Sequence, residues 1–335
     1  MKRRPYEKLK PTSRMAVDVL RRYPSVSIRL LAKYLNTRHP ALFRSIGYAR
    51  DLLRIESGVR PGRDGYFPTR PGVISRRGKY KLMPAPMHVI REPYVLPVGR
   101  WGVMADLHIP FHEIRPIESA IEWFLDQKIT GLIFQGDLQD CEALSFFGAT
   151  APRCFPVELE AMCDFLDMIR EIFPTIPIVW QRGNHEDRLE SYYRSHAAHL
   201  ADLPTSDMAS MLSLDKRKIT MLNRKQKITI NNFTMMHGHE MRGSYSPVSA
   251  SRWALLKAKA CCAVAHFHST SVTTGSDINH KMLTAWSVGC MCDLEPDYNT
   301  YGNQWNWGAA MLFNDGGDNW EFKNPRILPN GKLYY

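Results

Sequence analysis

Beyond position 100 of this chain of 335 residues, hydrophobic residues occur mostly in short runs separated by polar or turn-forming residues. Short apolar runs bounded in this way are typical of buried β-strands. They predict strands at residues 101–105, 131–134, 176–180, 233–236 and 261–265, and further ones at 282–288, 308–313 and 320–322. This part of the chain is therefore expected to be rich in β-structure.

Two segments between these runs have the spacing of amphipathic helices instead. Pro116 suits the first turn of a helix, and the apolar residues from Ile117 to Leu125 share one face. A second apolar stripe runs from Leu159 to Phe173. Strands that alternate with helices predict an α/β fold, with a mainly parallel or mixed sheet whose strands end at a common crevice.

The first hundred residues have a different pattern. Helical spacing at residues 14–22, 27–35 and about 41–55 predicts three short helices with a small shared core, and Ser27 is suited to cap the second. We interpret residues 1–57 as an all-α module of the helix-turn-helix or winged-helix type.

A basic segment follows this module. Residues 58–99 contain 7 proline and 6 glycine residues, a composition that excludes a regular helix and predicts an extended linker. Residues 100–335 would then form a catalytic domain. Residues 1–100 carry a net charge of +17 and the remainder −6, which gives the +11 of the whole chain. Such a polycation suits nucleic acid, because each neutralised phosphate releases counterions.

Six basic residues outside the predicted three-helix core are candidates for this contact. They are Arg29, Lys33, Arg38, Arg44, Arg50 and Arg54. Nothing in the segment indicates readout of a base sequence. The alternative is a solvated docking module that contacts protein or nothing. We favour nucleic acid as the partner.

Composition also bears on the compartment. No apolar run approaches the roughly 18 residues of a membrane span, and the basic start of the chain lacks the apolar stretch of a secretory signal. The seven cysteines are an odd number, which favours reduced and mostly buried thiols over disulfides or a metal knuckle. We therefore expect a cytoplasmic protein without a membrane partner. The sequence leaves the oligomeric state open.

Five short polar clusters follow the predicted strands in order. They are Asp106-Leu-His108, Gly136-Asp137-Leu-Gln-Asp140, Gly183-Asn184-His185-Glu186, His237-Gly-His239 and His266-Phe-His268. Each is weak alone, but five strand ends would bring them to one crevice. Imidazole, carboxylate and amide ligands suit divalent cations of intermediate hardness, and a pair of such ions can make water the attacking nucleophile. We expect two divalent cations, with Mn²⁺ favoured and Fe, Zn or Ni as alternatives.

In this order the clusters resemble the motifs of the calcineurin-like metallophosphoesterase superfamily, over roughly residues 100 to 310. The resemblance implies a β-sheet sandwich flanked by helices, and a dinuclear metal-dependent phosphoesterase. The ligands that it implies are Asp106, His108 and His268 for one ion, Asn184, His237 and His266 for the other, and Asp137 between them. His185 would protonate the leaving oxygen, oriented by Asp140, which suits a side chain that titrates near neutral pH. Ala265 stands where the family has glycine.

Two branches of this superfamily are relevant to the substrate. The segments 285–290 and 306–308 look like a bacterial and phage branch, similar to repair exonucleases. This resemblance implies a cytoplasmic protein that is either bacterial or phage-encoded in a host cytoplasm. The segment Arg182-Gly-Asn-His-Glu186 is similar to a serine/threonine phosphatase motif. That phosphatase branch has an arginine where this chain has Cys141. Loss of one fixed cation weakens binding of a doubly charged monoester more than that of a diester.

Three functional hypotheses follow. We favour a phosphodiesterase or nuclease that acts on nucleic acid. The alternative is a phosphomonoesterase of the serine/threonine protein phosphatase type. The third, a binding protein with a vestigial site, is disfavoured because no implied ligand is missing.

The remaining polar and aromatic residues near the motifs are less distinctive. His112, Arg182 and His239 are candidates for substrate contacts, and capping of a loop at the pocket rim is the alternative for the two histidines. Arg182 and Arg188 are also candidates to replace the missing arginine. Asp187 and Arg188 begin a charged helical stretch and are expected on a solvated face. The nearby Trp305 and Trp307 are expected to be packing residues, with stacking on a base as the alternative.

Overall fold

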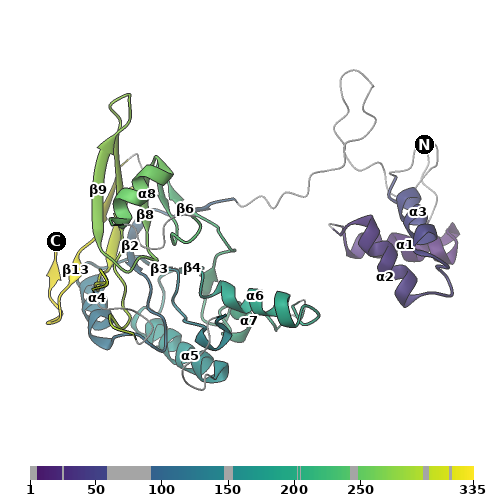
Figure 1. The fold of residues 1–335 in the computed structure, drawn as a ribbon, viewed down its shortest axis with the longest axis horizontal. Coiled ribbons are helices and arrows are strands. Elements are labelled where there is room, and N and C mark those ends of the chain that lie inside the picture. The colour runs from purple at the N-terminus through teal and green to yellow at the C-terminus, as the bar shows by residue number, and fades with distance from the viewer. Residues whose placement is uncertain are drawn as a thin grey trace. The chain divides into compact units, whose positions relative to one another are not determined.

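The computed structural model describes residues 6–24, 26–58, 92–146, 154–201, 203, 205–241, 248–296, 302–316 and 319–335. The chain forms two compact units, Met1–Ile90 and Arg91–Tyr335, and Figure 1 draws the helices of the first in purple and dark blue. Each unit is considered by itself. Most of the expected linker lies outside the described residues, which do not include 59–91.

The first unit consists of three short helices. They are α1 (Pro11–Arg22), α2 (Ile28–Arg38) and α3 (Ile46–Glu56), preceded by the 3₁₀ turn η1 (Tyr6–Lys8). Ser27 caps α2, as expected, because its hydroxyl accepts the Leu30 amide at 3.3 Å. The expected start of the third helix near residue 41 is wrong. Ser45 caps this helix, and Phe43 in the preceding turn is buried in the shared core.

The second unit is built on two six-stranded mixed sheets. One contains, in spatial order, β1 (Tyr94–Val95), β6 (Ile228–Ile230), β7 (Phe233–Met235), β8 (Cys261–Val264), β10 (Met282–Ser287) and β9 (Ser271–Ser276). The other contains β12 (Trp320–Lys323), β11 (Ala310–Asn314), β2 (Gly99–Met104), β3 (Gly131–Gln135), β4 (Ile178–Gln181) and β5 (Ile219–Met221). A small hairpin is formed by β13 (Arg326–Ile327) and β14 (Leu333–Tyr334). The helical elements are α4 (Ile114–Asp126), η2 (Glu142–Leu144), α5 (Phe155–Ile172), α6 (Asp187–His196), α7 (Met208–Met211) and α8 (Ala250–Ala258).

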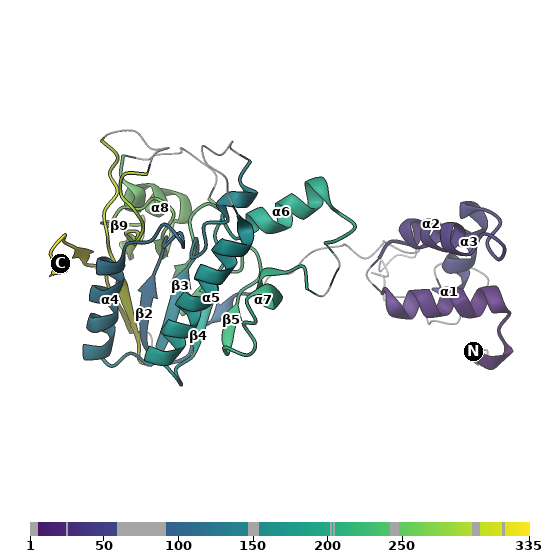
Figure 2. The ribbon, with the colours of Figure 1, turned by 90° about the horizontal axis from the view of Figure 1, so that it is seen from below.

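Alternation of side chains along the strands divides the core of this unit into layers. On β2, Trp101 and Val103 belong to the core between the sheets, whereas Met104 packs with the helices. On β3, Ile133 lies between the sheets and Phe134 lies on the helical side. Figure 2 shows α4 and α5 along one face of β2, β3 and β4, and α8 packs with β8 and β10 of the other sheet. The predicted sandwich flanked by helices is confirmed.

Strands from both sheets end at a common edge. The neighbours β2, β3 and β4 are parallel, with Met104 opposite Phe134 and Phe134 opposite Trp180. In the other sheet β7 and β8 are also parallel. The Gln135 side chain connects the sheets here, because its amide donates to the backbone carbonyls of Met236 at 2.9 Å and Ala263 at 3.1 Å. The loops that follow these five strands therefore converge.

The second unit begins before residue 100, where the sequence led us to place its boundary. Tyr94 and Val95 pair with β6, and the Gln226 side chain donates to the Glu92 carbonyl at 2.9 Å. Residues 92–99 are thus part of this unit and not of a linker.

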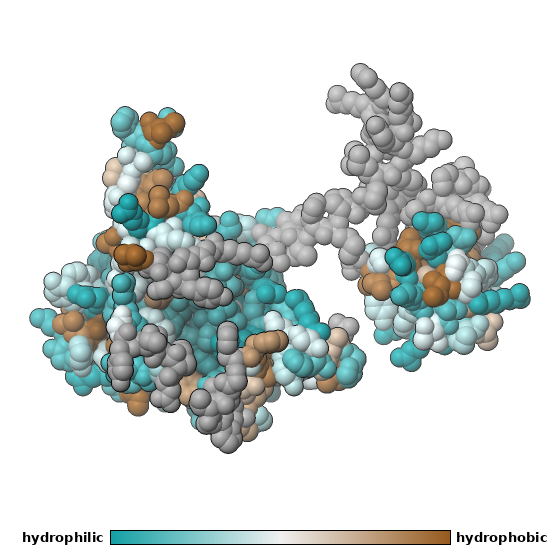
Figure 3. Space-filling model, in the orientation of Figure 1, coloured by the Kyte–Doolittle hydropathy of each residue, from teal (hydrophilic) through white to brown (hydrophobic). Residues whose placement is uncertain are grey.

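One surface feature of the second unit is apolar. On the face drawn in Figure 3, brown patches follow the projecting hairpin of β9 and β10, where Val272, Ile278 and Met282 are exposed. Across the described part of the chain, we find no helix with the length and apolarity needed to cross a bilayer.

Candidate metal centre

All seven predicted metal ligands lie at the edge where the strands end. Asp106 and His108 follow β2, Asp137 follows β3, Asn184 follows β4, His237 follows β7, and His266 and His268 follow β8. Asp106, Asp137 and His237 are buried. The two sheets together therefore supply one polar cluster inside an otherwise apolar sandwich.

One group of ligand atoms forms around Asp106. His108 Nε2 and His268 Nε2 lie 3.2 Å apart, and His268 Nε2 lies 3.6 Å from Asp106 Oδ1. The other carboxylate oxygen of Asp106 accepts the backbone amide of His266 at 2.9 Å. Asp106 Oδ1 itself is buried without a hydrogen-bond partner in the described structure. This buried, unpaired oxygen, together with the two imidazole nitrogens near it, leaves a place for a cation.

A second group forms around His237. Its Nε2 lies 3.0 Å from Asp137 Oδ2 and 3.2 Å from Asn184 Oδ1. Asp137, His237 and His266 offer ligand atoms that all lie within 4.8 Å of one another. Asp137 also belongs, with His108 and His185, to a second such group. Its carboxylate thus lies between the two sets of ligands, and its role as a bridging ligand stays a prediction.

Burial dominates the electrostatics of both groups. It raises the pKa of Asp106 to about 8 and lowers the pKa of His266 to about 3. Burial also opposes the charged form of His237, but the Asp137 carboxylate raises the pKa of His237 well above its usual value. In the protein alone, a proton on His237 therefore balances the charge of Asp137. Divalent cations of intermediate hardness would serve the same purpose, and the nitrogen and oxygen ligands fit them.

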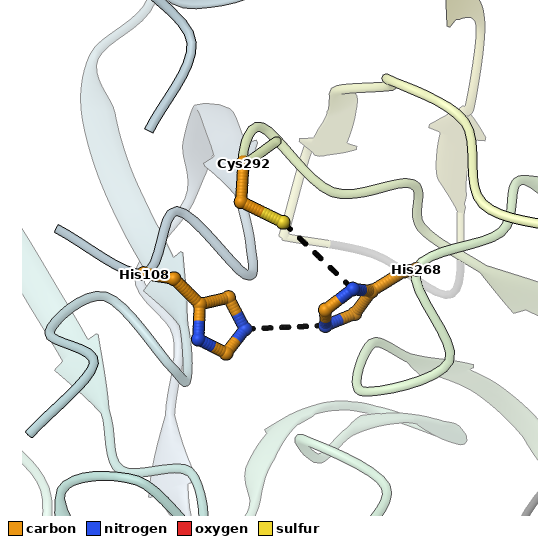
Figure 4. Close-up of side chains that lie close together, drawn as sticks. All are labelled: His108, His268 and Cys292. Atoms are coloured by element: carbon orange, nitrogen blue, oxygen red, sulfur yellow. Dashed lines mark hydrogen bonds between the residues drawn. The ribbon is translucent and has the colours of Figure 1, made fainter. Parts of the chain in front are cut away.

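The imidazoles are oriented through their second nitrogen atoms. His108 Nδ1 lies 2.7 Å from Asp140 Oδ1, and His237 Nδ1 lies 2.9 Å from the Gln135 carbonyl oxygen. His268 Nδ1 faces the Cys292 thiol at 3.8 Å, as Figure 4 shows. Each contact leaves Nε2 directed at the ligand group, which is how proteins usually orient metal-binding histidines.

The backbone of the ligand loops adopts a rare conformation. Five of the predicted ligands have positive φ angles between 47° and 69°, namely Asp106, His108, Asp137, His266 and His268. Left-handed backbone is uncommon outside glycine and gathers at functional sites, where the surrounding structure holds it in place. Gly183 allows a further close approach, because a Cβ atom there would overlap Asp137 Oδ1. Ala265 has no positive φ, so alanine fits where the related motif has glycine.

The Glu186 carboxylate holds two of these loops together. It is buried and accepts the backbone amides of Leu138 and Gly183, each at 2.7 Å. It also accepts the amides of Asp137 and Gln139. One carboxylate thus fixes the loop after β3 to the loop after β4.

The predicted catalytic pair is in contact. His185 Nδ1 lies 2.8 Å from the Asp140 carbonyl oxygen and 3.0 Å from Asp140 Oδ1. Burial opposes the charged form of His185, but the carboxylates of Asp137 and Asp140 raise its pKa. Asp140 thus orients both His185 and the ligand His108.

The expectation that Asp187 and Arg188 lie on a solvated helix face is wrong. Arg188 directs its guanidinium into the centre, where Nη2 lies 3.0 Å from His185 Nε2 and Nη1 donates to the Asp140 carbonyl at 3.0 Å. Asp187 is buried and pairs with Arg182 at 2.7 Å and Arg224 at 2.5 Å. The polarity at the start of α6 therefore reflects the ion pairs of the buried Asp187 and the contacts of Arg188 with His185 and Asp140.

The three predicted substrate contacts differ in their surroundings. His239 lies beside the second ligand group, 5.3 Å from the His237 ring between centroids, and both its nitrogens are buried without hydrogen-bond partners among the described residues. Arg182 is held by Asp187, as described above. His112 packs near Phe165, with ring centroids 6.3 Å apart. Contact of these three side chains with substrate stays a prediction.

Four residues of the centre were not among the site residues predicted from the sequence. They are Glu186, Arg188, Cys292 and Trp305. For two of them the place in the sequence was a signal, because Glu186 stands inside the third motif and Arg188 follows His185 by only three positions. No comparable signal indicated Cys292. Trp305 packs on His268 with ring centroids 4.0 Å apart, in line with the packing role expected of it.

One protein-family model and several solved structures are similar to this chain. The family model for calcineurin-like phosphoesterases matches residues 99–298, more than half of the chain. Vacuolar protein sorting 29 from Cryptosporidium parvum is similar, with 13% sequence identity and a TM-score of 0.39, over 71% of this chain and 96% of that one. Yfce, a phosphoesterase from E. coli, has 12% identity and a TM-score of 0.35, over 70% of this chain and 97% of that one.

A dimetal phosphatase from Danio rerio is similar to the same degree, with 12% identity and a TM-score of 0.35 over 69% of this chain and 96% of that one. Likeness at these scores carries no argument about the activity of this chain. No curated protein matches it.

Proposed function

Because the chain belongs to the calcineurin-like phosphoesterase family, we propose that it hydrolyses phosphodiester bonds in nucleic acid with the help of two divalent cations, preferably Mn²⁺. The family implies a metal-dependent phosphoester hydrolase. The observation that carries the proposal is the convergence of nitrogen and oxygen ligand atoms from both sheets, with Asp137 in two of the groups. The unpaired Asp106 Oδ1 lies 3.6 Å from His268 Nε2 and 3.9 Å from His237 Nε2. The proposed ligand sets are Asp106, His108 and His268 for one ion, Asn184, His237 and His266 for the other, and Asp137 for both.

Two side chains would act directly on the substrate or on its proton, and a third would orient one of them. When bound, the cations make water nucleophilic and neutralise phosphoryl charge. His185 would donate a proton to the leaving oxygen, and Asp140 fixes the orientation of its ring. Arg188 donates to His185 Nε2 in this structure, and two N–H groups cannot face each other. A phosphoryl oxygen that accepts from Arg188 would therefore free His185 Nε2 to carry the proton that is transferred.

The number of fixed cations supports a diester. Arg188 places one guanidinium beside His185, whereas Arg182 is held by Asp187 and Glu190 at 2.7 and 3.4 Å. Position 141, where the phosphatase motif has arginine, is a buried cysteine. One fixed guanidinium group matches the single negative charge of a diester. The alternative is a phosphomonoesterase, and Arg188 is the observation that favours it, since it could replace the missing arginine.

The first unit supports nucleic acid as the partner. Its six predicted phosphate contacts all lie on α2, on α3 or in the turn between them, and all are exposed: Arg29, Lys33, Arg38, Arg44, Arg50 and Arg54. Arg50 and Arg54 are four residues apart on α3, so they share one face. We continue to expect that the protein lies in the cytoplasm and is encoded by a bacterium or a phage.

The substrate class is tested with side-by-side assays of the full-length protein with Mn²⁺. Substrates are an aryl phosphodiester, an aryl phosphomonoester, and single-stranded and duplex nucleic acid. We expect hydrolysis of the diester and of nucleic acid to exceed that of the monoester. A clear preference for the monoester would establish the alternative, and no hydrolysis of any substrate would overturn both.

Two variants separate metal binding from proton transfer. His185→Ala should keep metal and lose about 10²- to 10⁴-fold in turnover, the usual contribution of a general acid. Asp137→Asn should lose metal and activity together. If His185→Ala left the rate on a poor leaving group unchanged, the general-acid role would be wrong.

The role of the first unit is tested by charge reversal in the full chain. Replacing Arg50 and Arg54 by glutamate should reduce the slope of log affinity against log salt by about 2, or about 1 for each lost phosphate contact. Hydrolysis of a small aryl ester should not change. The matched control reverses two exposed lysines of the second unit, Lys216 and Lys227. Equal slopes for both double variants and the wild type would remove the case for this unit.

A further inference from the structure

The outer contact of His268 differs from those of the other histidines of the centre. His108 and His237 are oriented by oxygen atoms, at 2.7 and 2.9 Å. His268 instead faces the thiol of Cys292, whose side chain is buried. A thiol is a weak and polarisable acceptor, and its reactivity differs from that of a carboxylate or a carbonyl. This contact makes one of the two ligand groups chemically distinct.

Ligand atoms of His108, His268 and Cys292 all lie within 4.8 Å of one another, so direct ligation by the sulfur is the alternative. The orientation of the His268 ring favours an outer partner. In Figure 4 the two nitrogens of the His268 ring point in different directions, with Nε2 toward His108 and Nδ1 toward Cys292. Nε2 is also the atom that lies 3.6 Å from Asp106 Oδ1. A histidine binds one ion through one nitrogen, so an ion held with His108 and Asp106 lies on the side of the ring away from the sulfur.

We propose that Cys292 is a positioning residue, which accepts the Nδ1 hydrogen of His268 and so directs Nε2 at the metal held with Asp106 and His108. The proposal rests on the function proposed above, because it concerns the same centre. Its consequence is an asymmetry between the two metal positions, since only one of them depends on a thiol.

The surrounding loop keeps the thiol in place. Trp307 Nε1 donates to the Cys292 carbonyl at 2.9 Å, and the backbone of Cys292 pairs with that of His112. The backbone amide of Asn306 donates to the His268 carbonyl at 2.8 Å, and the Trp305 ring packs on the imidazole. These contacts therefore hold both the Cys292 side chain and the His268 ring in place. The hydrogen bond between the sulfur and Nδ1 then determines that Nε2 faces the metal.

Two substitutions separate this role from packing. Cys292→Ala removes the acceptor, and loss of such an outer partner typically weakens metal binding about 10- to 100-fold. Cys292→Ser keeps an acceptor of similar size, and serine oxygen accepts a hydrogen bond better than sulfur does. We expect Cys292→Ala to bind one Mn²⁺ as the wild type does and the other about 10- to 100-fold more weakly. Cys292→Ser should restore both.

The experiment is a calorimetric titration of full-length, metal-free protein with Mn²⁺, repeated with Co²⁺ while the visible spectrum is recorded. Cys262→Ala is the matched control, because it removes another buried thiol of the same unit, on β8. It should bind both ions like the wild type. The Co²⁺ spectrum of the wild type should lack a thiolate-to-metal charge-transfer band.

Each result has one meaning. Equal affinities for both ions in Cys292→Ala and the wild type would overturn the positioning role, and a charge-transfer band that disappears in Cys292→Ser would show that the sulfur is a direct ligand instead. Should Cys292→Ala fail to fold, weak binding of one ion by a folded Cys292→Ser would also contradict the proposal. Failure of the wild type to bind any ion would refute the proposed function itself, which is a distinguishable outcome.

Discussion

Removal of the Glu186 carboxylate is predicted to destabilise the loops that carry the metal ligands. The carboxylate accepts four backbone amides, those of Asp137 at 3.1 Å, Leu138 at 2.7 Å, Gln139 at 3.2 Å and Gly183 at 2.7 Å. Glu186→Ala leaves these donors in a buried site without an acceptor. At about 1 kcal/mol for each unsatisfied donor, the free energy of unfolding should fall by about 4 kcal/mol.

The variant Glu186→Gln should have a free energy of unfolding between those of the wild type and Glu186→Ala. Glu186 Oε1 accepts from Leu138 and Gln139, and Oε2 accepts from Asp137 and Gly183. In either orientation of Glu186→Gln, the new amide nitrogen faces two of the four donors. We therefore expect a loss of about 2 kcal/mol, half that of the alanine variant.

Denaturant unfolding followed by tryptophan fluorescence measures this loss in the full chain. All 8 tryptophans lie at or after residue 101, so the signal reports on the second unit alone. A chelator keeps metal binding from adding to the stability. Glu160→Ala, which changes an exposed residue of α5, is the control and should shift the free energy by less than about 0.5 kcal/mol. A Glu186→Ala variant within about 1 kcal/mol of the wild type would refute the reasoning.

Three further predictions concern the centre. Arg188→Lys keeps the charge but loses the planar guanidinium with its paired N–H donors, so kcat/KM for the aryl diester should fall about 10-fold or more. An unchanged value would show that Arg188 does not contact the substrate. In Gly183→Ala the new methyl group displaces Asp137, so Mn²⁺ affinity measured by calorimetry should fall, and wild-type affinity would contradict the close approach. Burial opposes ionisation of Asp140, yet hydrogen bonds from His108 and His185 hold its pKa well below the usual value. Its contribution to stability is therefore present above the ordinary carboxyl pKa and lost as pH falls, so the stability difference between the metal-free wild type and Asp140→Asn should shrink between about pH 5 and pH 3. A difference that grows over this range would show the opposite sign.

The hydrophobic runs of the sequence predicted much of the sandwich but not its division into two sheets. Runs such as 131–134 and 261–265 are uninterrupted by polar residues, so they identify β3 and β8 directly. Strands such as β5, β6 and β9 are short or half-exposed, and no apolar run marks them. Strand order depends on contacts such as those of Gln135 with Met236 and Ala263, which no local pattern reveals.

The candidate site was predictable where chemistry and strand ends coincide. All seven ligands follow strands, so their order along the chain was enough to bring them together. Arg188 and Cys292 were not predictable in the same way, because their roles depend on the orientation of a helix start and on a loop that packs against His268. The late start of α3 has a similar cause, since burial of Phe43 in the core prevails over helical spacing.

The number of divalent cations bound by the full-length protein tests the central claim most directly. Metal-free protein is dialysed against Mn²⁺, and bound metal is measured by elemental analysis for the wild type and for Asp137→Asn. We predict about two ions for each wild-type chain, as in other two-metal phosphoesterase sites, and fewer for the variant. A wild type that holds no ion at saturating Mn²⁺ would contradict the account.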